Sequence, residues 1–151
     1  HLQDSTLVAR RLDRQSMVLC ASAHYLQAHG TPRRIEDLGG HAAVVFRQPT
    51  SGRSRPWQFR QRGVPVELHP PAQVRVNDGE GMIEAACLGL GVCQLPDYMV
   101  PDELARGTLV ELLPSCRPEP VPISVVYPSG RLLPARVRVA LDALDGLRRR
   151  A

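Results

Sequence analysis

The sequence predicts an α/β fold with a mostly parallel sheet, on two observations. Short apolar runs rich in β-branched residues alternate with stretches that carry the periodicity or the capping residues of helices. This alternation is typical of βαβ units, whose strands run in one direction. The chain has 151 residues and an apolar content of 43%, which is enough for one domain or two small lobes.

The first elements are two buried strands with a helix between them. Residues 17–22 (MVLCAS) are mostly apolar and predict a strand, and the AHYLQAH segment after them predicts a helix that ends at Gly30. Residues 31–38 (TPRRIEDL) have room for one helical turn. A second strand is expected at residues 42–47 (AAVVFR), after a Gly-Gly-His turn.

A β-hairpin is expected next, as an antiparallel addition to the sheet. Residues 57–61 and 64–68 alternate apolar and polar side chains, and the Arg62-Gly63 pair between them suits a tight turn. A pair of prolines then ends the second strand of the hairpin.

A strand–helix–strand unit follows the hairpin. After a brief strand at residues 74–76, Asn77 and Glu80 have the spacing of a capping box, so a helix is expected to begin at about Asp78. Its apolar residues recur at helical spacing, and two glycines stop it before a strand at residues 92–95.

The pattern continues through one more helix and strand. The helix is expected from Pro96 through Leu104, and Gly107 closes it before a strand at residues 109–113. The proline-rich segment 114–122 then interrupts the alternation. It is the best candidate for a crossing between two lobes.

The chain after this segment is too short to form a lobe by itself. A strand at residues 123–127 and an amphipathic helix at residues 134–147 cannot bury their apolar faces without partners. Before the large unit there is one further candidate strand, at residues 7–12. We therefore expect the partners of this second lobe to lie upstream of His1, and the sequence to be a fragment of a longer protein.

Composition argues against several classes of function. The net charge is +4, yet every basic residue is arginine and most are interspersed with acids, which favours a solvated basic face over a nucleic-acid site. The four cysteines form no CxxC pair and stand mostly in apolar runs, so buried free thiols are favoured over a metal or redox site. No run of about 18 apolar residues could cross a bilayer, and the first residues lack a secretory signal, so a cytoplasmic location is expected.

Signatures of catalysis are absent from the sequence. There is no GxSxG elbow or Ser-x-x-Lys, and the glycine pairs complete neither GxGxxG nor a P-loop. Glu80 and Glu84 could share a helix face as an acid–base pair, but carboxylates at this spacing are common on solvated helices. The helix start at Asn77, Asp78 and Gly79 could hold an anionic group at the carboxyl edge of the strands, or these residues could simply cap the helix.

Taken in order, several segments resemble LysR-type transcriptional regulators. They are STLVARRL, MVLCASAHYLQAHGTPRRIEDLGGH, WQFRQRG, VNDGEGMIEAACLGLGVCQLPDYMV, GTLVELLP and PISVVYPSGRLLPARVRVALDAL. The CASAHYL start, the DLxxH turn and the GxGxxxLP stretch are specific for this family as an ordered set. The resemblance runs almost from end to end.

The resemblance implies a periplasmic-binding-protein-like fold of type 2, in which a small-molecule effector binds between two lobes to control transcription. Residues 16–120 would form lobe two, a nearly complete Rossmann-like lobe. Residues 1–15 would be the remnant of lobe one with the first crossover strand, and residues 121–151 its return strand and C-terminal helix. A winged helix-turn-helix domain, the part expected to contact promoter DNA, would lie upstream of His1.

The resemblance also implies effector-binding residues in lobe two. They belong to a strand, a helix start and the turn after a later strand: Val45, Phe46, Arg47, Asn77, Asp78, Gly79 and Pro96. Phe46 could equally be ordinary core, and Pro96 could simply end a strand. Because of the helix start and the nearby Arg47, we expect the effector to be an organic or aromatic acid.

Non-enzymatic sensing is the favoured function, with no cofactor, no metal and no membrane partner. A homo-oligomer is expected, most simply a dimer, because the family pairs its sensing domains. A solute-binding receptor of the same fold is the alternative and would need export. An enzyme that uses a carboxylate or Cys93 is less favoured, as is direct DNA binding without a helix-turn-helix pattern.

Overall fold

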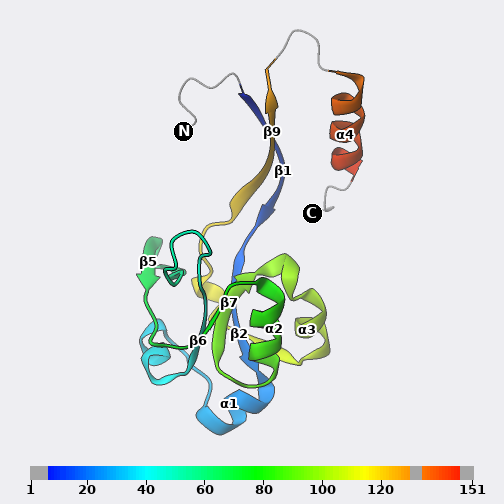
Figure 1. The fold of residues 1–151 in the computed structure, drawn as a ribbon. Helices are drawn as coiled ribbons and strands as arrows, with labels where there is room; N and C mark the ends of the chain where they lie inside the picture. The colour runs from blue at the N-terminus through cyan, green and yellow to red at the C-terminus, as the bar shows by residue number, and fades with distance from the viewer. Residues whose placement is uncertain (1–6, 130–133, 147–151) are drawn as a thin grey trace. The chain divides into compact units, whose positions relative to one another are not determined.

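The computed structural model describes residues 7–129 and 134–146 (Figure 1). These residues form two compact units, one made by Ser16–Glu119 and the other by the described residues on either side of it. The large unit contains two clusters of buried apolar side chains, one on each face of its sheet. The small unit consists of β1 (Leu7–Gln15), β9 (Val121–Pro128) and α4 (Ala135–Gly146).

A five-stranded sheet is the centre of the large unit. Its strands, in spatial order, are β6 (Ala72–Val76), β3 (Ala43–Phe46), β7 (Val92–Pro96), β2 (Met17–Ser22) and β8 (Leu109–Leu112). β3 pairs in parallel with β6 and β7, whereas β2 pairs antiparallel with β7 and β8. β2 therefore runs against the other strands of this sheet.

Four of the five strands run in the same direction, as expected, but both pairings of β2 are antiparallel, so the sheet is mixed. The alternation of elements had placed β2 in a βαβ unit. The strands beside β2 come much later in the chain, as shown by Cys20, whose partner Cys93 is 73 positions away. The alternation of neighbouring elements does not indicate which distant strands pair. The predicted direction of β2 was therefore wrong.

Side chains alternate between the two faces of this sheet. In β2, Leu19 and Ala21 lie in one core cluster with side chains of α1 (Ala23–His29) and the hairpin. Val18 and Cys20 lie in the other, which is covered by α2 (Gly79–Cys87). A strand that is buried on both faces is apolar throughout, which explains the MVLCAS run.

The hairpin has the bounds that the sequence predicts, β4 (Trp57–Gln61) and β5 (Val64–Leu68). It is a separate two-stranded sheet, so the expectation that it adds to the main sheet was wrong. Both turn residues have positive φ, +50° at Arg62 and +82° at Gly63, as a type I′ turn requires. The predicted helix from Pro96 through Leu104, in contrast, is divided in two.

A short 3₁₀ helix, η2 (Asp97–Met99), precedes α3 (Pro101–Arg106). Pro101 supplies no backbone N–H, and Val100 before it has φ −127° and ψ 23°, outside the helical region. These two residues interrupt the helix. Gly107 closes α3 with φ +73°, as expected.

Several strand ends differ from the prediction. β8 stops at Leu112 because Leu113 has φ +50°, which no strand accommodates. β1, β6 and β9 are longer than expected and β3 is shorter at both ends.

In the small unit, β1 and β9 pair antiparallel from Leu7 opposite Pro128 to Gln15 opposite Val121. α4 begins at Ala135, and the predicted last residue, Leu147, lies outside the described residues.

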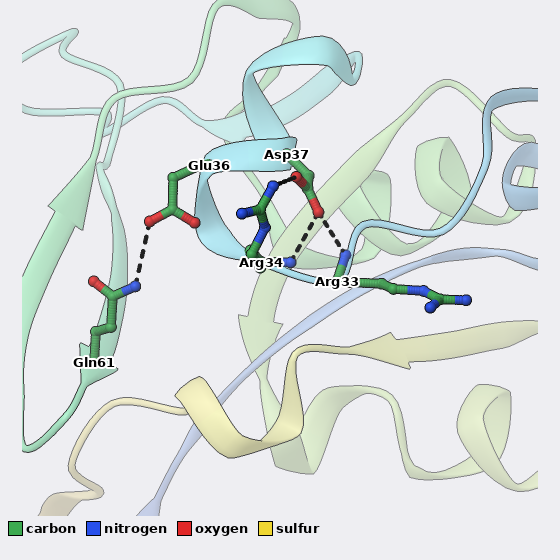
Figure 2. A network of polar contacts seen from close by, with 5 residues as sticks. All are labelled: Arg33, Arg34, Glu36, Asp37 and Gln61. Carbon is green, nitrogen blue, oxygen red and sulfur yellow. Dashed lines mark hydrogen bonds and ion pairs between the residues drawn. The ribbon is translucent and has the colours of Figure 1, made fainter.

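The predicted helical turn at residues 31–38 is a 3₁₀ helix, η1 (Ile35–Gly40), anchored by Asp37 (Figure 2). Asp37 Oδ2 accepts hydrogen bonds from the backbone N–H groups of Arg33 and Arg34 at 2.9 and 3.0 Å. The bond from Arg33 is the largest reason that the pKa of Asp37 lies below its usual value. Glu36 accepts a bond from Gln61 Nε2 at 3.3 Å, which links η1 to the hairpin.

None of the helices in the described ranges is long and apolar enough to cross a membrane. Within the same ranges, no three His, Cys, Asp or Glu side chains gather as a metal site would need. Cys20 and Cys93 are fully buried free thiols with their sulfur atoms 3.6 Å apart, while Cys87 and Cys116 are half-buried.

Candidate ligand-binding site

A cavity of about 180 Å³ opens at one edge of the five-stranded sheet. It lies where β3 and β7 reach their carboxyl ends and where β2, which runs the other way, begins. The first turn of α2 and the 3₁₀ helix η2 complete its wall. The lining residues are Met17, Phe46, Arg55, Gly79, Met82, Gln94, Leu95, Pro96 and Met99. The carboxyl edge of parallel strands is where α/β folds usually bind ligands.

Three of the seven residues expected at the site line this cavity: Phe46, Gly79 and Pro96. They come from β3, from the first residue of α2 and from the end of β7. Phe46 also packs against the core cluster beneath α2, so it is both core and cavity wall. The other four predicted residues lie outside the lining.

Val45 does not line the cavity, because successive side chains of a strand point to opposite faces. It is completely buried in the core cluster that contains Trp57 and Phe59. Arg47 is exposed beyond the end of β3. Its backbone N–H donates to Val76 O at 2.7 Å, and its Nε donates to Gly52 O at 3.3 Å.

Asn77 and Asp78 also lie outside the cavity lining, and their roles differ from the expected capping box. Asp78, not Asn77, is the N-cap of α2, and its Oδ1 accepts a hydrogen bond from Gly81 N at 2.6 Å. The positive end of the helix thus already faces a carboxylate. A ligand anion placed there would meet the negative charge of Asp78.

Leu95 belongs, with Pro96, to the turn that was expected near the site. Five other lining residues were not anticipated from the sequence: Met17, Arg55, Met82, Gln94 and Met99. Three of them are all the methionines that the chain contains. Met82 was recognised only as part of the apolar stripe of its helix, and nothing in a single sequence separates such a residue from core. Arg55 stands in a polar loop without a motif, so no local signal identified it.

The two polar lining side chains differ in their hydrogen bonding. Gln94 is 7% exposed and both ends of its amide are engaged, because Oε1 accepts from Gln58 N at 2.9 Å and Nε2 donates to Gln58 O at 2.7 Å. Arg55 is held through its backbone, where its N–H donates to Phe46 O at 2.8 Å. Among the described residues its guanidinium forms no ion pair or hydrogen bond.

Cys93, considered as a nucleophile in an enzyme, lies on the far side of β7 from Gln94 and is not exposed at all. Its hydrogen bond with Cys20 and its burial raise the pKa of the Cys93 thiol well above the usual value. A buried neutral thiol is unreactive.

A second hollow, of about 200 Å³, lies beside the hairpin and is lined by residues of β4, β5 and the segment Pro118–Glu119. Its Arg60 is paired with Glu119, and both side chains are largely exposed. Arg60, the cation of this hollow, therefore has an ion-pair partner, whereas Arg55 has none among the described residues.

Comparison with known proteins identifies relatives over nearly the whole chain. The family model of the LysR substrate binding domain matches residues 1–148. The HTH-type transcriptional regulator YhjC of Escherichia coli K12 is 33% identical over 97% of this chain and 49% of its own length. The HTH-type transcriptional regulator CrgA of Neisseria meningitidis serogroup C is 34% identical, over 95% of this chain and 47% of its own length. The chain thus spans about half the length of these curated relatives.

Solved structures agree with this assignment. The regulatory domain of CrgA from Neisseria meningitidis superposes with a TM-score of 0.81 at 32% identity, covering 99% of this chain and 72% of that one. The regulatory domain of AphB from Vibrio vulnificus gives a TM-score of 0.83 at 28% identity, covering 97% of this chain and 71% of that one.

Proposed function

Because this chain belongs to the LysR substrate-binding domain family, we propose that it is the effector-sensing part of a transcription regulator. The observation that carries the proposal is the cavity at the carboxyl ends of β3 and β7, with its apolar wall and a single cation that has no ion-pair partner among the described residues. Such a site suits a small molecule with an apolar body. We propose that the effector is a small organic or aromatic acid.

We further propose that the Ser16–Glu119 unit is lobe two of this sensing domain, and that β1, β9 and α4 belong to lobe one. Five apolar side chains of the β1–β9 ribbon are 38–48% exposed, which supports a need for further partners: Leu7, Val8, Val121, Ile123 and Val126. In this proposal promoter DNA is bound by a separate helix-turn-helix domain. The named relatives, described as HTH-type regulators, support that division.

Three broader properties follow from the same proposal. The protein would act without catalysis, which is supported by the lining of the cavity: none of its nine residues is an acid, a histidine, a cysteine or a hydroxyl residue. It would work in the cytoplasm, where a bacterial regulator meets DNA. It would form a homo-oligomer, most simply a dimer, because oligomers of regulators match the symmetry of their operators.

The proposal is tested by measuring ligand binding to the intact chain with a panel of small organic acids, by ligand-observed NMR and by thermal shift. A Met99→Trp variant fills the cavity from its half-buried side and is expected to abolish binding. Tyr98→Trp is the matched control, because Tyr98 is 45% exposed and does not line the cavity. Absence of binding to the unchanged chain, or equal binding by both variants, would contradict the proposal.

A further inference from the structure

The charge of the cavity comes from one side chain. Seven of the nine lining residues are apolar or glycine, and the other two are Gln94 and Arg55. The amide of Gln94 is engaged on both sides by the backbone of Gln58. Gln94 keeps one further N–H but is neutral, so Arg55 is the lining side chain that can pair with a charged ligand atom.

The loop that carries Arg55 is fixed by its own hydrogen bonds. Gln48 N donates to Arg53 O at 2.9 Å and Gly52 N donates to Gln48 O at 2.8 Å. At the base of the loop, Arg55 N donates to Phe46 O, so the start of the Arg55 side chain is anchored next to a residue of the cavity wall. Backbone hydrogen bonds therefore hold the loop, and the five N–H donors of the Arg55 guanidinium remain available to a ligand.

The loop from Arg47 to Arg55 contains three arginines and no acid. Arg47 uses its Nε on Gly52 O, and Arg53 is exposed and absent from the cavity lining. These two residues add positive potential near the mouth, whereas Arg55 is the one in a position to contact a bound anion.

Two carboxylates stand next to lining residues, and neither lines the cavity itself. The carboxylate of Asp78 accepts a hydrogen bond from Gly81 N and blocks the start of α2 as an anion site. Asp97, next to Pro96, has a buried Oδ1 atom that accepts no hydrogen bond from the described residues. A ligand carboxylate would be repelled by both of these groups and attracted by Arg55.

The apolar side chains of the lining suit the remaining part of the ligand. Met82 and Leu95 are 1% and 2% exposed, and Phe46 and Met99 are half-buried beside them. Thioethers contact aromatic rings favourably and adapt to their shape. The volume of about 180 Å³ is below that of pockets for drug-sized molecules, so a compact ligand is required.

We infer that Arg55 selects the ligand: the cavity takes a compact monocarboxylate with a ring-sized apolar body, whose carboxylate pairs with Arg55 and whose body contacts Phe46, Met82 and Met99. This inference rests on the proposed function and adds the residue and the orientation that select the ligand. It assigns the carboxylate to the loop after β3 rather than to the N-terminus of α2.

The test compares benzoate with its uncharged isostere benzamide by ligand-observed NMR titration of the intact chain. The unchanged chain is expected to bind benzoate about tenfold more tightly, the size of one charge-assisted contact. Arg55→Gln should remove that preference and leave benzamide binding within about twofold. Arg47→Gln, which removes the same charge from the same loop, is the matched control and should keep a preference of about tenfold.

The possible results separate the two levels of the proposal. Equal binding of both probes by the unchanged chain, or equal loss in Arg47→Gln and Arg55→Gln, would overturn the role of Arg55 and leave the cavity as a ligand site. Failure of both probes to bind would overturn the proposed function as well. Because Arg55 has no side-chain partner among the described residues, Arg55→Gln should melt at the temperature of the unchanged chain. If this variant unfolds, the ratio of benzoate to benzamide affinity in the unchanged chain still tests whether the cavity prefers the carboxylate.

Discussion

Met99 lies so close to Gly79 that a Cβ atom at position 79 would overlap the Met99 Cε atom. The φ of Gly79 is not in the left-handed region, so this glycine is needed for space and not for backbone conformation. Both residues line the cavity. The thioether of Met99 thus forms part of the wall because α2 begins with a residue that has no side chain.

Gly79→Ala should weaken ligand binding while leaving the fold intact. The added methyl group displaces the half-buried Met99 side chain, which has room to rotate, so the free energy of unfolding should change by less than about 1 kcal/mol. A methyl group in a small pocket should lower benzoate affinity by about tenfold, measured by NMR titration. Glu80→Ala, at the exposed next position, is the control, and an unchanged affinity in Gly79→Ala would contradict the role given to Met99.

Asp78→Ala should destabilise the protein by about 1 kcal/mol, and Asn77→Ala should have little effect. The reason is that the carboxylate of Asp78 accepts the hydrogen bond from Gly81 N, whereas Asn77 is exposed and is not the N-cap. Urea unfolding of the two variants measures the difference. If Asn77→Ala were the more destabilising of the two, the assignment of the cap would be wrong.

The elements of this fold were largely predictable because their ends are determined locally. The hairpin was predicted with its exact bounds from side-chain alternation around Arg62-Gly63, and α1 from its apolar pattern and Gly30. The direction of β2 was not predictable, since β2 pairs with strands far along the chain.

Only part of the cavity lining was predictable from the sequence. Sequence reasoning reached the cavity through Phe46, Gly79 and Pro96, which stand at the ends of predicted elements. Sequence reasoning selected Arg47 and not Arg55, because Arg47 directly follows a predicted strand. The path of the loop after Arg47 cannot be predicted from its sequence. The turn between Gln48 and Arg53 returns the chain so that Arg55 lines the cavity.

Gln94→Leu should cost about 2 kcal/mol or more, because it leaves both the N–H and the carbonyl of Gln58 without their partner in a part-buried position. Chemical denaturation provides the measurement. Gln58→Ala is a matched control, since the contact uses the backbone of Gln58 and survives loss of its side chain. An equal loss of stability in the two variants would show that the side chain of Gln58, and not the amide of Gln94, holds the hairpin.

Stability should decrease as the pH falls below about 6.5, the usual pKa of histidine, through the titration of His41. The hydroxyl oxygen of Tyr25 accepts a hydrogen bond from Ala42 N at 2.9 Å and forms a second hydrogen bond, of 3.2 Å, with His41 Nδ1. These contacts hold the His41 ring in a part-buried position, which disfavours its charged form. Burial, and then the charge of His29, lower the pKa of His41, with a smaller opposing effect from Asp37.

The direction of this pH effect on stability follows from the number of protons that each state binds. Between the lowered pKa of His41 in the folded chain and the ordinary value in the unfolded chain, the unfolded state binds more protons, so acidification in this window favours unfolding. The free energy of unfolding measured at pH 7.5 and at lower pH should therefore fall less in His41→Gln than in the unchanged chain. His69→Gln, at an exposed histidine, is the control and should keep the full decrease. An NMR titration that gave His41 a pKa above the ordinary histidine value would refute both the neutral state and the direction of the effect.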